Sequence, residues 1–111
     1  MHQQILKKVL DYSGDLDTIS RTLAPYGWDF EEPVAILNRH HNASILERYL
    51  VGSLTKQNLE DWGNAIEGRE DIDYEKGYER LIEDAIHHLA NPLLTEPISK
   101  QSIRGVLARM K

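Results

Sequence analysis

The sequence predicts an all-α fold, organised as a single compact domain of about six short helices that spans residues 1–111. Apolar residues recur three and four positions apart through most of the chain, which is the spacing of one helix face. No segment alternates polar and apolar residues for long enough to indicate a sheet. No glycine- or serine-rich linker divides the chain, whose length is typical of one domain.

Two short helices are expected first. Asp15 is placed to cap the second, which stops before Pro25 because proline cannot continue a helix; the first ends near Gly14. Each carries one apolar stripe, so each needs the other to bury it. The two stripes are Ile5, Leu6, Val9 and Leu10, followed by Leu16, Ile19 and Leu23.

The next segment, residues 24–38, breaks this pattern. Pro25, Gly27 and Pro33 punctuate it, and such residues mark turns and loops. Residues 34–37 read "VAIL" and are compatible with a brief extended piece or with the start of a helix. Both alternatives stay open.

A helical pair is predicted next, joined by the short turn "GSLT". Asn38 opens the first helix and Gly52 ends it, while Thr55 caps the second and Gly68 stops it. Gly63 lies inside the second helix, where it is expected to let another helix or a partner approach closely. The inward residues are Ile45, Leu46, Tyr49 and Leu50, then Leu59, Trp62 and Ile66, with Trp62 expected in the core.

The clearest helix is predicted to begin at Asp73, its N-cap, and to close at Asn91, with Gly77 inside it. Ser99 is expected to cap the final helix. The apolar faces comprise Tyr74, Tyr78, Leu81, Ile82, Ala85 and Leu89, then Ile103, Val106, Leu107 and Met110.

The net charge of −5 argues against phosphate-backbone binding as the main activity, because lysine and arginine supply most of that affinity. The charge is also uneven, since ten acids face three basic residues between Glu60 and Asp84, whereas no acid follows Ser99. The absence of cysteine and of any signal-peptide or membrane-spanning pattern favours a soluble, cytoplasmic protein.

The acids are densest in "EGREDIDYE", residues 67–75. An EF-hand starting at Asp71 fails, because Lys76 takes the glycine position and Ile82 the final glutamate position. The predicted helix would also have begun where the calcium loop should still be turning.

Catalytic chemistry is disfavoured too. Glu75, Glu79 and Glu83 would share one solvent-facing helix stripe, where carboxylates keep ordinary pKa values and make poor general acids at neutral pH. The His40–His41 and His87–His88 neighbours point about 100° apart on a helix, so neither pair can clamp one metal. Phosphate-binding loops, nucleophile elbows and cofactor fingerprints are absent from the sequence. No catalytic residue, metal ligand or cofactor is therefore predicted.

Residues 46–94 resemble small all-helical bacterial proteins associated with toxin–immunity loci. The resemblance rests on "LERYLVGSLT", on "EDWGNAIEGREDI" and on "HLANP". Some members of this group are similar to immunity proteins of contact-dependent growth inhibition systems, which neutralise a partner's toxic C-terminal domain, often a nuclease. The resemblance implies a cytoplasmic, non-catalytic inhibitor and transfers no catalytic residues.

The leading hypothesis is an immunity protein whose acidic face binds a cognate toxin domain, expected to be a basic nuclease, with no direct contact to nucleic acid, membrane or a small-molecule substrate. Charge supports it, because an acidic surface complements a basic cleft and speeds encounter. A regulatory or scaffolding domain with an apolar groove, and a metal-dependent hydrolase using His87 and His88, are the alternatives. The predicted partner-binding residues are Glu67, Glu70, Asp71, Asp73, Tyr74, Glu75 and Glu79, with Trp28, Asp29, Glu31 and Glu32.

Overall fold

The computed structural model describes residues 2–14, 16–26 and 34–110. Within these ranges the chain forms six α-helices, one 3₁₀ turn and two short strands, so the fold is mostly but not purely helical. The elements in chain order are α1 (His2–Asp11), α2 (Leu16–Leu23), the 3₁₀ turn (Ala24–Tyr26), β1 (Ala35–Leu37), α3 (Arg39–Leu50), α4 (Lys56–Ile66), β2 (Ile72–Tyr74), α5 (Glu79–Ala90) and α6 (Lys100–Met110).

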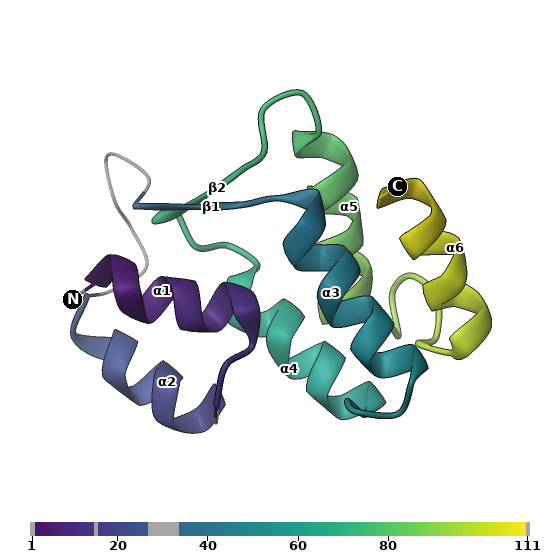
Figure 1. Cartoon of the computed structure of the whole chain (residues 1–111), viewed down its shortest axis with the longest axis horizontal. Coiled ribbons are helices and arrows are strands. Elements are labelled where there is room, and N and C mark those ends of the chain that lie inside the picture. The colour runs from purple at the N-terminus through teal and green to yellow at the C-terminus, as the bar shows by residue number, and fades with distance from the viewer. Residues whose placement is uncertain (1, 15, 27–33, 111) are drawn as a thin grey trace.

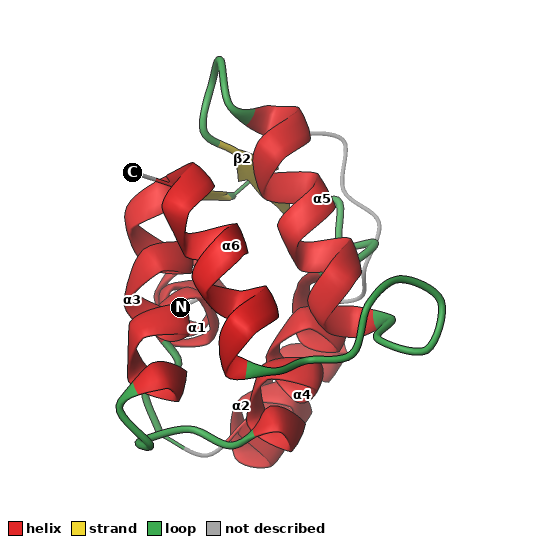
Figure 2. Ribbon diagram, turned by 90° about the vertical axis from the view of Figure 1, so that its right-hand side faces the viewer, coloured by secondary structure: helices red, strands yellow, loops and turns green. Residues whose placement is uncertain are grey.

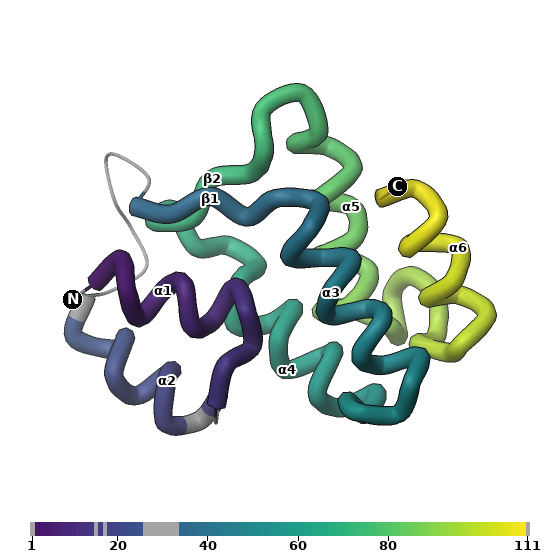
Figure 3. The backbone as a smooth tube through the Cα atoms, viewed as in Figure 1, coloured from purple at the N-terminus to yellow at the C-terminus, as the bar shows by residue number. Residues whose placement is uncertain are grey.

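The helices pack in three pairs, as Figures 1 and 3 show: α1 with α2 at one end, then α3 with α6 and α4 with α5. The Cα radius of gyration is 13.2 Å, close to the value of about 13 Å expected of one compact domain of about 100 residues. Each helix in the described ranges falls short of the length and apolar character needed to cross a bilayer.

The strands correct the all-α prediction. β1 and β2 pair in parallel, with Ala35 opposite Ile72 and Leu37 opposite Tyr74. Ala35 and Leu37 are buried and Ile36 is exposed. Of the two alternatives for the segment "VAIL", the structure therefore shows the extended one. Three residues are too few to display a period of two in the sequence, which explains why the pattern predicted no sheet.

The predicted start of the fifth helix is also wrong, because α5 begins at Glu79 and not at Tyr74. Gly77 lies in the turn before it with φ +90°, a left-handed conformation that glycine adopts without strain. Asp73 lies in β2, where its carboxylate accepts a hydrogen bond from the Tyr74 N–H at 2.9 Å and caps no helix. The four-residue spacing of Tyr74 and Tyr78 mimics a helix face across this turn.

Two other predicted caps, Thr55 and Ser99, are confirmed, and Asn38, which was predicted only to open its helix, also caps it. Asn38 Oδ1 accepts from the His41 N–H at 2.9 Å, and His41 Nδ1 accepts from the Asn38 N–H at 3.0 Å, a reciprocal capping box. Thr55 makes the same exchange with Asn58, and Ser99 Oγ accepts from the N–H of Ser102. Asp15, the remaining predicted cap, lies outside the described residues.

The core centres on α4. Trp62 is 0% exposed, as predicted, and its indole Nε1 donates to Val9 O at 2.7 Å, tying α4 to α1. A Cβ placed on Gly63 would lie 2.8 Å from Ala90 N, so Gly63 does permit the close approach of α5. Other fully buried side chains are Leu6, Leu37, Ile45, Leu46, Leu59, Ile66, Ile82, Ile86, Leu89 and Ile103.

Candidate partner-binding surface

The predicted acidic segment runs from the end of α4, through β2, to the start of α5 (Figure 1). The chain therefore changes direction repeatedly here, and its carboxylates have different surroundings. Trp28, Asp29, Glu31 and Glu32, the second part of the predicted surface, lie outside the described residues.

Asp71 is not a surface residue, contrary to the prediction. Its side chain is 0% exposed and accepts hydrogen bonds from Arg69 Nε at 2.8 Å and Arg69 Nη2 at 2.7 Å. His2 Nε2, from α1, lies 2.9 Å from the same carboxylate. Burial alone would raise the pKa of Asp71, but the hydrogen bonds and charges of Arg69 and His2 hold this pKa below its ordinary value. Asp71 thus fastens β2 to the first helix.

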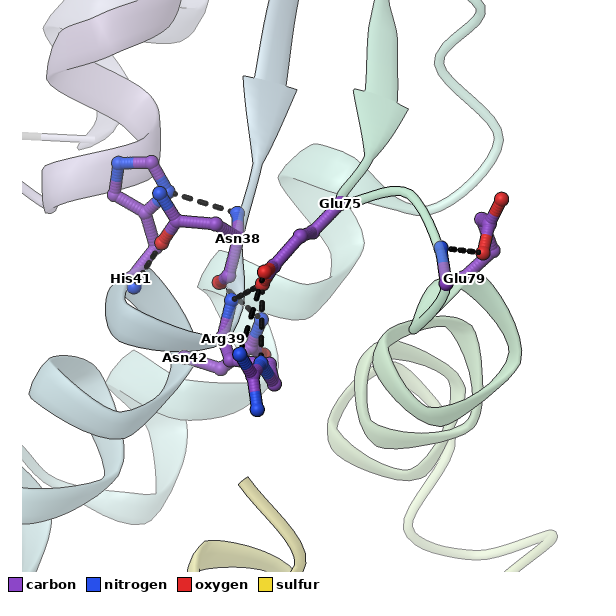
Figure 4. A network of polar contacts seen from close by, with 7 residues as sticks. Asn38, Arg39, His41, Asn42, Glu75 and Glu79 are labelled. Atoms are coloured by element: carbon purple, nitrogen blue, oxygen red, sulfur yellow. Dashed lines mark hydrogen bonds and ion pairs between the residues drawn. The ribbon is translucent and has the colours of Figure 1, made fainter. Parts of the chain in front are cut away.

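Glu75 is also engaged internally. Its carboxylate accepts from the backbone N–H of Arg39 at 3.0 Å and from Arg39 Nε at 3.2 Å, as Figure 4 shows. These hydrogen bonds lower the pKa of Glu75, and the bond from the backbone N–H has the larger effect. The Arg39 guanidinium also stacks on the exposed Tyr78 ring, with Cζ 3.6 Å from the ring centroid. Glu75 therefore joins the start of α3 to the turn before α5.

Glu67 joins α4 to α5. Its Oε2 lies 2.8 Å from His87 Nδ1, and Asn91 Nδ2 donates to Oε1 at 3.0 Å. His87 thus pairs with Glu67 across helices, not with Glu83 along its own helix. Glu79 accepts from the Gly77 N–H at 2.7 Å and closes the turn before α5 (Figure 4). The predicted stripe of Glu75, Glu79 and Glu83 is broken, because only the last two lie on α5.

Tyr74 lies within electrostatic reach of three of the remaining carboxylates. Burial raises the pKa of its half-buried phenol, and the nearby carboxylates of Glu83, Glu67 and Asp73 raise it further. These three acids come from α5, from the residue after α4 and from β2. Folding therefore gathers carboxylates that are dispersed in the sequence. The sequence pattern placed Glu83 on the same helix stripe as Glu75 and Glu79 but did not include it among the partner-binding residues.

Glu70 and Asp73 are exposed and form no ion pair with another described residue. We define the acidic surface as Glu67, Glu70, Asp73, Tyr74 and Glu83. Its carboxylates are available to an external cation to different degrees, since Glu67 contacts His87 and Asn91, and Asp73 accepts one hydrogen bond from the Tyr74 N–H.

The histidine pairs do not build a chemical centre in the described part of the chain. His88 Nε2 lies 2.9 Å from the Glu96 carbonyl oxygen, and His41 serves the α3 cap. No three histidine, aspartate or glutamate side chains of the described residues are grouped to hold a metal ion. Comparison of the chain with models of protein families, with curated proteins and with solved structures gave no match.

Proposed function

We propose that this chain is an immunity protein, which binds a basic toxin domain through the acidic surface and neutralises it without chemistry of its own. The observation that carries the proposal is the exposure of Glu70, Asp73 and Glu83 where α5 packs against β2, around a half-buried Tyr74 whose phenol pKa is raised by burial and by Glu83, Glu67 and Asp73. Glu67 and Asp73 make local contacts within the fold, but the mutual repulsion of carboxylates gathered in one place opposes folding. A cationic partner relieves that repulsion when it binds.

The surface has the composition of a binding site for a basic protein. Carboxylates complement the lysine and arginine side chains with which nucleases hold phosphate, and this complementarity accelerates association. Tyr74 and the neighbouring Tyr78 add aromatic surface, which is enriched among the residues that dominate interface energies. Asp71 and Glu75 are left out of the revised surface, since Arg69, His2 and Arg39 already occupy them.

The proposal predicts that a neighbouring gene encodes a large protein with a basic C-terminal toxin domain. That domain is then used to measure Kd by calorimetry and the association rate by stopped flow. The double variant Glu70→Lys/Asp73→Lys should weaken binding at least about tenfold and slow association, because two exposed carboxylates are replaced by ammonium groups that repel a basic partner. The control Asp61→Lys/Glu96→Lys makes the same change in net charge at exposed sites outside the surface. Rising salt should slow association of the wild type.

The acidic surface would be the wrong site if both double variants lost affinity equally, or if the wild type bound with no dependence on salt. Protection of cells that express the toxin gives an independent readout. The Glu70→Lys/Asp73→Lys protein should protect poorly, while the control should protect as the wild type does.

A pocket of about 380 Å³ between α5 and α6 favours a second candidate, a scaffolding or regulatory domain that receives a partner's apolar side chains. Leu81, Ala85, Val106 and Met110 supply its apolar lining. If this groove is the binding site, Leu81→Asp abolishes partner binding, and the wild-type affinity changes little with salt.

A further inference from the structure

The connection between α5 and α6 displays two leucines to solvent. Leu93 is 100% exposed and Leu94 is 79% exposed, more than any other large apolar side chain in the described residues. Figure 2 shows this connection as a loop that projects from the helical body. Leucines in water contribute nothing to the core, and adjacent exposed apolar side chains are typical of a surface that another molecule covers.

The leucines are held on an ordered turn. The N–H groups of Leu94 and Thr95 both donate to the Asn91 carbonyl oxygen at 3.1 Å, and Thr95 Oγ1 donates to the same oxygen at 2.8 Å. Further along, Ser102 Oγ donates to Pro97 O at 3.0 Å. The turn is therefore organised before any partner arrives, which reduces the entropy lost on binding.

A hollow lies directly beside this projection. It has a volume of about 200 Å³ and is bounded by Pro92, Leu93, Pro97 and Ile98 of the connection. Lys56 and Glu60 of α4 contribute the charged part of its rim. Neither charge forms an ion pair with another described residue, although they lie one helical turn apart.

We propose that a second copy of this chain covers the surface, forming a two-fold symmetric dimer in which each Leu93–Leu94 turn enters the hollow of the other copy. A two-fold contact requires a surface that is complementary to itself: if one residue contacts a second residue of the other copy, that second residue contacts the first in return. This surface has two pairs of neighbouring features that a two-fold axis would bring together. The projection lies next to a hollow, and Lys56 lies next to Glu60, so each lysine would face Glu60 of the second copy.

The first test measures molecular mass by sedimentation equilibrium from micromolar to millimolar protein. The wild type should dimerise, and Leu93→Asp/Leu94→Asp should raise the dimer Kd at least about a hundredfold, because each substitution acts on both sides of the two-fold axis. Val51→Asp is the matched control. Val51 is 77% exposed in the turn after α3, outside the proposed contact, so this variant should dimerise normally.

Charge exchange provides a sharper test. Lys56→Glu alone and Glu60→Lys alone should each weaken the dimer several-fold, since like charges then meet twice. Mixing these two variants should restore association as a heterodimer. In that heterodimer the introduced carboxylate of one chain faces the introduced ammonium of the other, and the two unchanged side chains of the pair also face each other with opposite charge. A direct contact between these positions predicts recovery in the mixture that persists at high salt, where attraction between distant charges is screened.

A wild type that stays monomeric at millimolar concentration overturns the proposal, as does a mixture that fails to associate or a Val51→Asp variant that is equally impaired. The result is separable from the proposed function, because Glu70→Lys/Asp73→Lys should dimerise as the wild type does. If the wild type is monomeric and Leu93→Asp/Leu94→Asp instead weakens toxin binding, the turn serves the toxin and not a second copy.

Discussion

Replacing Gly63 with alanine tests the packing of α4 against α5. A Cβ at this position would lie 2.8 Å from Ala90 N, 3.0 Å from Leu89 Cβ and 3.1 Å from Leu89 C. Two of these three atoms belong to the backbone of α5, so no side-chain rotation relieves the overlap and the helices must separate. Overpacking of this kind costs roughly 1–3 kcal/mol.

The same substitution improves helix propensity by about 1 kcal/mol, which offsets part of that cost. Because the closest contact is with backbone, we expect the upper part of the range and a net loss of about 1–2 kcal/mol. For a domain of about 100 residues this lowers Tm by roughly 4–8 °C per kcal/mol.

Gly105 of α6 is the matched control, because a Cβ there meets nothing within 4 Å. Gly105→Ala should stabilise the protein by up to about 1 kcal/mol through helix propensity alone. The two variants are compared by urea unfolding followed by far-UV circular dichroism, with the m-value checked for constancy. If Gly63→Ala stabilised the protein as Gly105→Ala does, the close approach of α4 and α5 would be disproved.

Three further predictions concern single polar groups. Trp62→Phe should cost about 0.5–1.5 kcal/mol in urea unfolding through the lost indole hydrogen bond, since the Tyr12 N–H still donates to the Val9 carbonyl oxygen. Asn38→Ala should cost about 1 kcal/mol by removing the α3 cap, and Asn38→Asp should retain most of it. The lowered pKa of Asp71 stabilises the fold above the ordinary aspartate pKa of 3.8, and this stabilisation is lost as the pH falls further. Asp71→Asn should therefore reduce stability at neutral pH and flatten the acid decline; an unchanged pH profile would contradict the buried ion pair.

Helices were predictable where a stripe of apolar residues was long enough to show its period. The caps Thr55 and Ser99 and the helix start at Asn38 could be identified as well, because a helix start depends on neighbours three residues away. The sheet could not be predicted, since β1 and β2 are short and their partners are remote in sequence. Gly77 offered a turn signal, but the spacing of the two tyrosines around it agreed with a continuous helix.

The candidate site was predictable in composition and not in geometry. Nothing local distinguishes Asp71 from Glu70, yet one is buried and the other exposed, because Arg69 folds back on Asp71 and His2 arrives from the opposite end of the chain. Likewise, Glu83 joins the acidic surface only after the turn at Gly77 brings α5 beside β2. Charge density located the region, and folding decided which carboxylates remain available.

The parallel sheet also has a consequence for the order of folding. Its strands are separated along the chain by α3 and α4, so pairing must wait until this long connection has closed, whereas each helix forms from local contacts. Only a few backbone hydrogen bonds then hold the sheet, while α4 and α5 share the deepest part of the core. In native-state hydrogen exchange, the amides of Leu37 and Glu75 should consequently open before those of Leu59 and Ile86, by a local opening that leaves the helical body folded.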